Sequence, residues 1–230
     1  MFYKIQGLIY RKNKVTSENI FNELIKFINT LPNWSEKPKL WFIATPKGSV
    51  KGIENGQTSQ DALSYVDEMI KSNNSISVIL ADENEDDSIL TLWFKNTQAI
   101  SEDRYTFSLT IKSLSKLNDF NVFLDIFNKL TSLDEWKFKY IFLDTEQYRR
   151  KELSVFEDRL AVGWILFLPQ LISSEHARSA FKVIQRKEIN GTIIISSEIF
   201  DGKNPLHISH ANNVEIELAA DGFLPLLKGL

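Results

Sequence analysis

The sequence predicts an α+β protein with mostly antiparallel sheets, in which two related strand–helix–strand modules pack into one compact body. Two observations predict this class. Apolar residues alternate at period two in some segments and follow a helical spacing in others, and this succession occurs twice. Residues 3–34 align without a gap on residues 105–136, with seven identical pairs. We therefore expect an N-terminal module over residues 1–102 and a C-terminal module over residues 103–230.

In the first copy, the alternation of Ile5, Gly7 and Ile9 predicts a half-buried strand. A helix follows, with Ser17 as its expected N-cap and Pro32 as its end. Its apolar face comprises Ile20, Phe21, Leu24, Ile25, Ile28 and Leu31. The next expected elements are a strand at 41–45, a helix near 59–71 and strands at 76–81 and 89–95. The second helix would bury Ala62, Tyr65, Val66, Met69 and Ile70 on one face.

The second copy follows the same order, with a strand around Phe107, Leu109 and Ile111 and a helix whose apolar face contains Val122, Phe123, Ile126, Phe127, Leu130 and Leu133. A strand at YIFLDT, a helix near 146–158, a strand at 161–168, a helix near 174–183 and a strand at 192–196 are expected next. The last helix spans about 205–220. Asn204 caps it, Pro205 takes its first position, and Gly222 ends it.

Composition excludes several classes of protein. The chain has no cysteine, which removes disulfides, thiolate metal sites and thiol nucleophiles. Its start lacks a signal-peptide segment, and no apolar run approaches the roughly 18 residues of a membrane helix. The net charge of −3 shows no basic excess for nucleic-acid binding. We expect a cytoplasmic protein that contacts neither membrane nor nucleic acid.

The segment DENEDDS places five carboxylates in seven residues: Asp82, Glu83, Glu85, Asp86 and Asp87. A calcium-binding EF-hand loop needs Gly at its sixth position and Glu at its twelfth, where this chain has Asp87 and Trp93. Adjacent carboxylates in water also lack the separated environments of a general acid/base pair. Two interpretations remain, a solvated turn and a surface that attracts a basic partner.

Other candidate chemistry is weaker. The stretch KGSVKGIENG (47–56) lacks the Lys-Ser/Thr ending of a phosphate-binding loop, so we expect a flexible loop there. His207 and His210 lie three apart without a third zinc ligand nearby, which favours cap or surface histidines. No nucleophile motif is present. The sequence therefore assigns no catalytic residue, no metal ligand and no cofactor.

The segments GWILFLP (163–169) and GTIIISSEIFDGKNPLHISHANNVEIELAADGFLPLL (191–227) resemble the closing part of the bacterial immunity protein 52 family. The matching elements are Gly163-Trp164 before Leu168-Pro169, Gly191-Thr192 at the start of a strand, Phe200-Asp201, Asn204-Pro205, Ala211-Asn212, Glu215-Ile216, Leu218 and the ending at Gly222 and Leu224-Pro225. The resemblance covers roughly residues 160–227. Over the first 150 residues only the order of elements agrees.

This resemblance implies a cytoplasmic antidote encoded beside a polymorphic toxin, which protects the producing cell and its kin in bacterial competition. The implied partner is the C-terminal domain of a nuclease toxin of restriction-endonuclease-like type, exported by type VI secretion or a related contact-dependent system. The family pattern contains no catalytic residues, and we assign none. A nuclease cleft is basic, so the acidic segment gains a sharper role as a mimic of the phosphates that such a cleft binds.

We therefore predict an immunity protein that is not an enzyme and that neutralises its toxin by stoichiometric sequestration, through a mixed acidic and aromatic surface. The predicted partner-binding residues are Asp82, Glu83, Glu85, Asp86 and Asp87. Two alternatives stay open. One is an enzyme of unrecognised class acting on a small molecule, which a deep pocket with convergent polar groups and acids of strongly shifted pKa would favour. The other is a dimerising scaffold, and a homodimer is compatible with either non-enzymatic interpretation.

Overall fold

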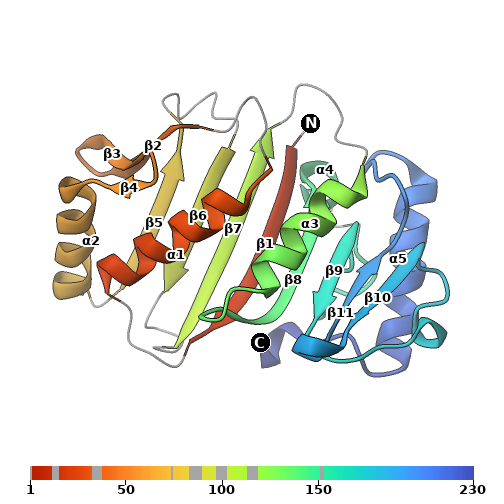
Figure 1. The fold of residues 1–230 in the computed structure, drawn as a ribbon. Helices are drawn as coiled ribbons and strands as arrows, with labels where there is room; N and C mark the ends of the chain where they lie inside the picture. Colours follow the sequence, from red (N-terminus) through yellow and green to blue (C-terminus); the bar gives the residue numbers. More distant parts are fainter. Residues whose placement is uncertain are drawn as a thin grey trace. The chain divides into compact units, whose positions relative to one another are not determined.

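The computed structural model describes residues 2–11, 16–32, 38–73, 75–82, 90–96, 103–112, 119–150 and 153–230 (Figure 1). These residues form five α-helices and eleven β-strands, which confirms the α+β class. In chain order the elements are β1 (Phe2–Tyr10), α1 (Ser17–Thr30), β2 (Leu40–Thr45), β3 (Gly48–Glu54), β4 (Gln57–Thr58), α2 (Gln60–Asn73), β5 (Ile76–Ala81), β6 (Leu90–Asn96), β7 (Arg104–Lys112), α3 (Phe120–Thr131), β8 (Lys137–Thr145), α4 (Glu146–Arg150), β9 (Ile165–Leu168), β10 (Lys182–Arg186), β11 (Gly191–Ile195) and α5 (Pro205–Ala220).

The strands join in the order β10-β11-β9-β8-β1-β7-β6-β5-β2-β3-β4. Neighbours such as β5 and β6, β6 and β7, β8 and β9, and β10 and β11 pair antiparallel. Short connections between β5 and β6, between β6 and β7, and between β10 and β11 favour this arrangement, because a parallel pair needs a crossover of a dozen or more residues. The predicted antiparallel sheet is confirmed.

The internal repeat is visible in the elements. The strands β1 and β7 each have nine residues and occupy equivalent positions of the repeat. The helices α1 and α3 follow them, and β2 and β8 come next, so both copies have the predicted strand–helix–strand order. The chain also divides into two compact units. Unit 1 consists of Met1–Leu8, Ser113–Phe127 and Phe138–Leu230, and unit 2 consists of Ile9–Lys112 and Asn128–Lys137. The division into these units reflects which residues pack together and does not coincide with the two copies of the repeat. The module boundary at residue 102 therefore stays a prediction.

In unit 2, α1 lies across one face of the strands β5 to β7 (Figure 1). Most of its predicted apolar face is buried, because residues three and four apart fall on the same side of a helix, and only Ile25 of that face is half-buried. Phe27, which the predicted apolar face does not include, is also buried, and it packs edge-on against Phe107 of β7, with 5.1 Å between the ring centroids. Trp136 lies within 5.7 Å of Phe94 and 5.3 Å of Phe107. Unit 2 is thus built around an aromatic core.

A buried ion pair adjoins this core. The Arg11 guanidinium donates to both carboxylate oxygens of Glu23, one of them at 2.7 Å, and the two side chains are 4% and 6% exposed. The indole N–H of Trp136 donates to the same carboxylate at 2.8 Å. A charge removed from water in this way depends on its partners, so the three residues act together.

In unit 1, every residue of β9 and β11 is buried, which explains the apolar run of β9 and the three isoleucines that end β11. The helix α5 packs on them, with Val214 and Leu218 in one cluster with Leu166 and Ile194. Its capping is as predicted. The Asn204 side chain accepts a hydrogen bond from the Leu206 N–H, Pro205 takes the first turn, and Gly222 follows the helix at a φ of +76°.

The prediction of a flexible loop at residues 47–56 was wrong, because these residues form β3 and its turn. The strand pairs with β2 from Thr45↔Gly48 to Leu40↔Glu54. A Cβ at Gly52 would lie 2.9 Å from the Trp41 carbonyl, so glycine permits the close pairing. Asn55 and Gly56 have φ values of 50° and 76°, as a tight hairpin turn requires. The glycines therefore mark a hairpin.

Two predicted helices were also wrong in whole or in part. In place of a helix near 174–183, only Ser174–His176 is helical, as a single 3₁₀ turn, and β10 follows. The N–H of Ser179 donates to the Glu217 carboxylate instead of a carbonyl one turn back, and β10 finds its partner in β11. The helix near 146–158 begins at Glu146 but does not continue through Val155, whose N–H donates to Glu215.

Smaller differences have local causes. The N-cap of α1 is Thr16, one residue before the predicted Ser17, and its hydroxyl accepts from the Asn19 N–H at 3.2 Å. The strand expected at 161–168 begins only at Ile165. Gly163 precedes it at a φ of +61°, a conformation that does not belong to a strand.

Candidate partner-binding surface

The predicted acidic site adjoins a β-hairpin of unit 2. Asp82 is half-buried and directly follows β5, whereas Glu83, Glu85, Asp86 and Asp87 lie outside the described residues. The flanking strands β5 and β6 pair from Ile76↔Asn96 to Ala81↔Thr91, so the segment connects two adjacent antiparallel strands, as predicted. A binding role for the five carboxylates stays a prediction.

Trp93 belongs to the face of β6 opposite its buried residues Leu92 and Phe94, and 39% of its side chain is exposed. Its indole N–H donates to the Ser77 hydroxyl at 3.1 Å. The Lys95 ammonium lies 5.3 Å from the centre of its ring. These contacts hold the ring in place at the surface, which is the condition for an aromatic anchor in a protein–protein interface.

Ser77 also connects Trp93 to a pocket in the same unit. The Ser77 N–H donates to the Met69 sulfur at 3.1 Å, and Met69 lines that pocket. Asp82 lies at the other end of β5, and the rise of about 3.3 Å per residue places it roughly 17 Å away along the strand. The acidic segment and the pocket therefore mark the two ends of β5.

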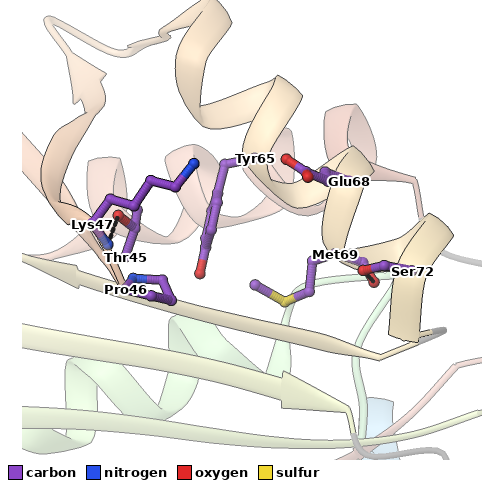
Figure 2. Close-up of a pocket in the computed structure, with 7 residues that line it drawn as sticks. All are labelled: Thr45, Pro46, Lys47, Tyr65, Glu68, Met69 and Ser72. Carbon is purple, nitrogen blue, oxygen red and sulfur yellow. Dashed lines mark hydrogen bonds between the residues drawn. The ribbon is translucent and has the colours of Figure 1, made fainter.

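The pocket lies between α2 and the turn from β2 to β3 and has a volume of about 290 Å³ (Figure 2). It is lined by Thr45, Pro46, Lys47, Tyr65, Glu68, Met69 and Ser72. The turn is fixed by the Thr45 hydroxyl, which donates to the Gly48 carbonyl at 2.5 Å and accepts from the Lys47 N–H at 3.2 Å. On α2, Tyr65 and Met69 are one turn apart, so their side chains reach the pocket together.

Figure 2 shows how these side chains lie. The Tyr65 ring stands in the middle, with its hydroxyl directed between Pro46 and Met69. The Glu68 carboxylate and the Met69 thioether lie on one side of the ring, and the Lys47 ammonium lies on the other. Within the described ranges, the Tyr65 hydroxyl, the Lys47 ammonium and the Glu68 carboxylate form no hydrogen bond or ion pair with one another or with other residues. An apolar wall with such polar groups suits the binding of a side chain or small ligand.

Two groups with a raised pKa, Glu215 and Tyr148, lie in a buried cluster of unit 1. Glu215 is fully buried and accepts hydrogen bonds from the N–H groups of Val155 at 2.9 Å, Phe156 at 3.2 Å and Val162 at 3.5 Å. Burial raises the pKa of Glu215, and these hydrogen bonds oppose the rise. Burial also raises the pKa of Tyr148, and the negative charge of the Glu215 carboxylate raises it further.

This cluster anchors a loop. Both oxygens of the Glu215 carboxylate face backbone N–H groups of the segment that precedes β9, and the Tyr148 hydroxyl donates to the Asn212 side chain at 3.3 Å. Perturbed acids often mark active sites, but buried structural networks shift the pKa in the same way. The sequence placed Glu215 only among the residues of the family resemblance. Its anchoring role needed the fold to bring the loop and α5 together.

The histidines and carboxylates of the described residues form no group of three or more that could hold a metal ion. His207 accepts a hydrogen bond from the Asp201 N–H at 2.9 Å, close to the start of α5, and His176 contacts the Asp221 carboxylate at 2.7 Å. Across the same ranges, every helix is too short or too polar to cross a membrane.

No protein-family model and no curated protein matches the sequence, so membership of the immunity protein 52 family stays a prediction. The fold is similar to the solved structure of the Pseudomonas aeruginosa T6SS protein PA0821. The TM-score is 0.53 at 10% sequence identity, and the match covers 93% of this chain and 73% of that chain. At this identity the likeness shows that the two chains have a similar fold.

Proposed function

We propose that this protein is an immunity protein associated with type VI secretion, which binds the toxic domain of a secreted nuclease and neutralises it without catalysis. The observation that carries the proposal is the likeness of fold, over 93% of the chain, to a protein named for that secretion system. The resemblance of residues 160–227 to the immunity protein 52 family supports the same class.

The surface of unit 2 supports this proposal through its chemistry. Trp93 is an exposed aromatic ring, Tyr65 lines the pocket on α2, and five carboxylates follow β5 from Asp82 in the sequence. Aromatic anchors bordered by charged groups are typical of protein–protein interfaces. A nuclease binds phosphates with Lys and Arg, so its cleft is complementary to an acidic segment.

The mode of inhibition is tested by titration. The purified toxic domain encoded by the neighbouring gene is mixed with increasing amounts of this protein, and cleavage of a labelled nucleic acid is followed. We expect nuclease activity to fall linearly and to end at one molar equivalent, because a sequestering inhibitor is consumed one for one. Complete inhibition by a small fraction of an equivalent, growing with time, would instead indicate an enzyme that modifies the toxin or a ligand.

The acidic segment gives a kinetic prediction. Replacing its five carboxylates by Asn and Gln, at Asp82, Glu83, Glu85, Asp86 and Asp87, is expected to slow association with the toxic domain by about tenfold or more at low ionic strength. Steering by charge is screened by salt, so the dependence of the association rate on salt should also become shallower. Stopped-flow measurements at several salt concentrations test both effects.

The matched control makes the same change of net charge on exposed carboxylates of unit 1. It replaces Glu157, Asp158, Glu175, Glu188 and Glu198. If this control slows association as much as the variant in the acidic segment does, only the overall charge matters and the local role is wrong.

A further inference from the structure

The pocket on α2 has the chemistry to recognise one particular side chain. We propose that it binds a single arginine of the partner protein, between the Tyr65 ring and the Glu68 carboxylate. This inference adds a specific contact to the proposed function. It rests on that function only in taking the arginine to come from the toxic domain. The binding chemistry itself belongs to residues of unit 2 alone.

The arrangement of the lining residues favours a guanidinium group. A guanidinium is planar, stacks on aromatic faces and forms paired hydrogen bonds with a carboxylate. Tyr65 offers the face and Glu68 the carboxylate, and both adjoin the same hollow (Figure 2). The aliphatic stem of an arginine would lie along Met69 and Pro46, as long charged side chains do on apolar surfaces. A volume of about 290 Å³ accommodates one long side chain and excludes a helix.

The charges around the pocket favour a cation on the Glu68 side. A second hollow adjoins the pocket, shares Glu68 and Ser72 with it, and is also lined by Asp67 and Lys71. Asp67 and Lys71 are one turn apart on α2, and their opposite charges offset each other. The negative charge of Glu68 is then left to attract a cation. Lys47 lies on the other side of the Tyr65 ring from Glu68, so the ring separates the two charged groups (Figure 2). An acidic side chain would have to bind Lys47 instead, which gives a clear alternative to test.

The structure provides its own reporter for this test. The chain has two methionines, Met1 and Met69, so methyl-labelled protein gives one methionine signal from the pocket. The labelled protein is titrated with N-acetyl-arginine N-methylamide, which represents an arginine within a chain. We expect a saturable shift of the Met69 methyl signal. The citrulline analogue, which keeps the shape without the charge, should shift it at least about fivefold less at equal concentration.

Two variants distinguish the cation from the alternative anion. Glu68→Gln is expected to weaken binding of the arginine analogue about fivefold, because it removes the charge that pairs with the guanidinium. Lys47→Ala should leave that binding unchanged or strengthen it, since a nearby like charge is removed. Loss of binding in Lys47→Ala, or a stronger response to N-acetyl-glutamate N-methylamide than to the arginine analogue, would overturn the proposal.

Free arginine distinguishes the source of the side chain. If free arginine binds more than about tenfold more tightly than the capped analogue, the pocket recognises an amino acid and not a protein, and the proposal is wrong. The toxic domain completes the test. Glu68→Gln should weaken its binding and Glu54→Gln, which alters an exposed carboxylate of the neighbouring hairpin, should not. A wild-type protein that neutralises the toxin while Glu68→Gln binds it equally well would refute this inference and leave the proposed function intact.

Discussion

Replacing Glu23 by Ala is expected to lower the free energy of unfolding by about 3–5 kcal/mol, because it leaves the Arg11 guanidinium buried without its partner. Both side chains are at most 6% exposed. The change also removes the acceptor of the Trp136 indole N–H, which has a cost of its own. Denaturation with urea at neutral pH, compared with the unchanged protein, measures the loss.

An exposed ion pair of the same unit provides the control. Lys26 and Glu135 are 2.9 Å apart with side chains 57% and 37% exposed, and Lys26→Ala should cost less than about 1 kcal/mol. The double variant Arg11→Met with Glu23→Leu should regain most of the stability, since no charge stays buried. Equal losses in Glu23→Ala and Lys26→Ala would show that the buried pair has no special weight in unit 2.

Replacing Glu215 by Ala is expected to lower the free energy of unfolding by about 2–4 kcal/mol, since several N–H groups of the loop before β9 lose their acceptor together. Glu217 on the same helix serves as the control, because it accepts two hydrogen bonds from Ser179 but is only half-buried. Glu217→Ala should cost about 1 kcal/mol. A smaller loss in Glu215→Ala than in Glu217→Ala would contradict the anchoring role.

The same residue predicts a dependence on pH. The pKa of Glu215 is raised above its ordinary value of 4.5, so the folded protein holds this proton more tightly than the unfolded chain does. The unchanged protein should therefore lose stability relative to Glu215→Gln as the pH rises above that value, until the folded carboxyl is ionised. Unfolding of both proteins between about pH 4 and pH 7 tests the direction. A difference that grows in favour of the unchanged protein would show that hydrogen bonding outweighs burial.

Elements with strong local signals were predicted well from the sequence. The helix α5 has the predicted bounds, since Asn204 and Pro205 fix its start through local geometry. The repeat correctly identified β1 and β7 as equivalent strands, because the buried face of a strand keeps its alternating apolar pattern. By contrast, Lys182 and Val183 at the start of β10 were predicted as the end of a helix, and the rest of β10 was assigned to no element. Its strand conformation depends on β11, which no signal within Lys182–Arg186 reveals.

The pocket could not be predicted because its residues come from two elements without a shared motif. Helical spacing correctly placed Tyr65 and Met69 on the apolar side of α2, together with Ala62 and Val66. The structure buries Ala62 and Val66 completely, whereas Tyr65 and Met69 are half-buried at the pocket. The other side of the pocket is lined by Thr45, Pro46 and Lys47, which lie at the turn between β2 and β3. Because residues 47–56 were expected to form a flexible loop, no pattern in the sequence placed this turn beside α2.

Survival of cells tests the central claim most directly. The toxic domain encoded by the neighbouring gene is expressed in cells with and without this protein, and colonies are counted. We expect the domain to kill cells that lack the protein and to spare those that contain it, with both chains purifying together. Equal killing in the two strains, by a domain that is shown to be active, would contradict the proposal that this protein is an antidote.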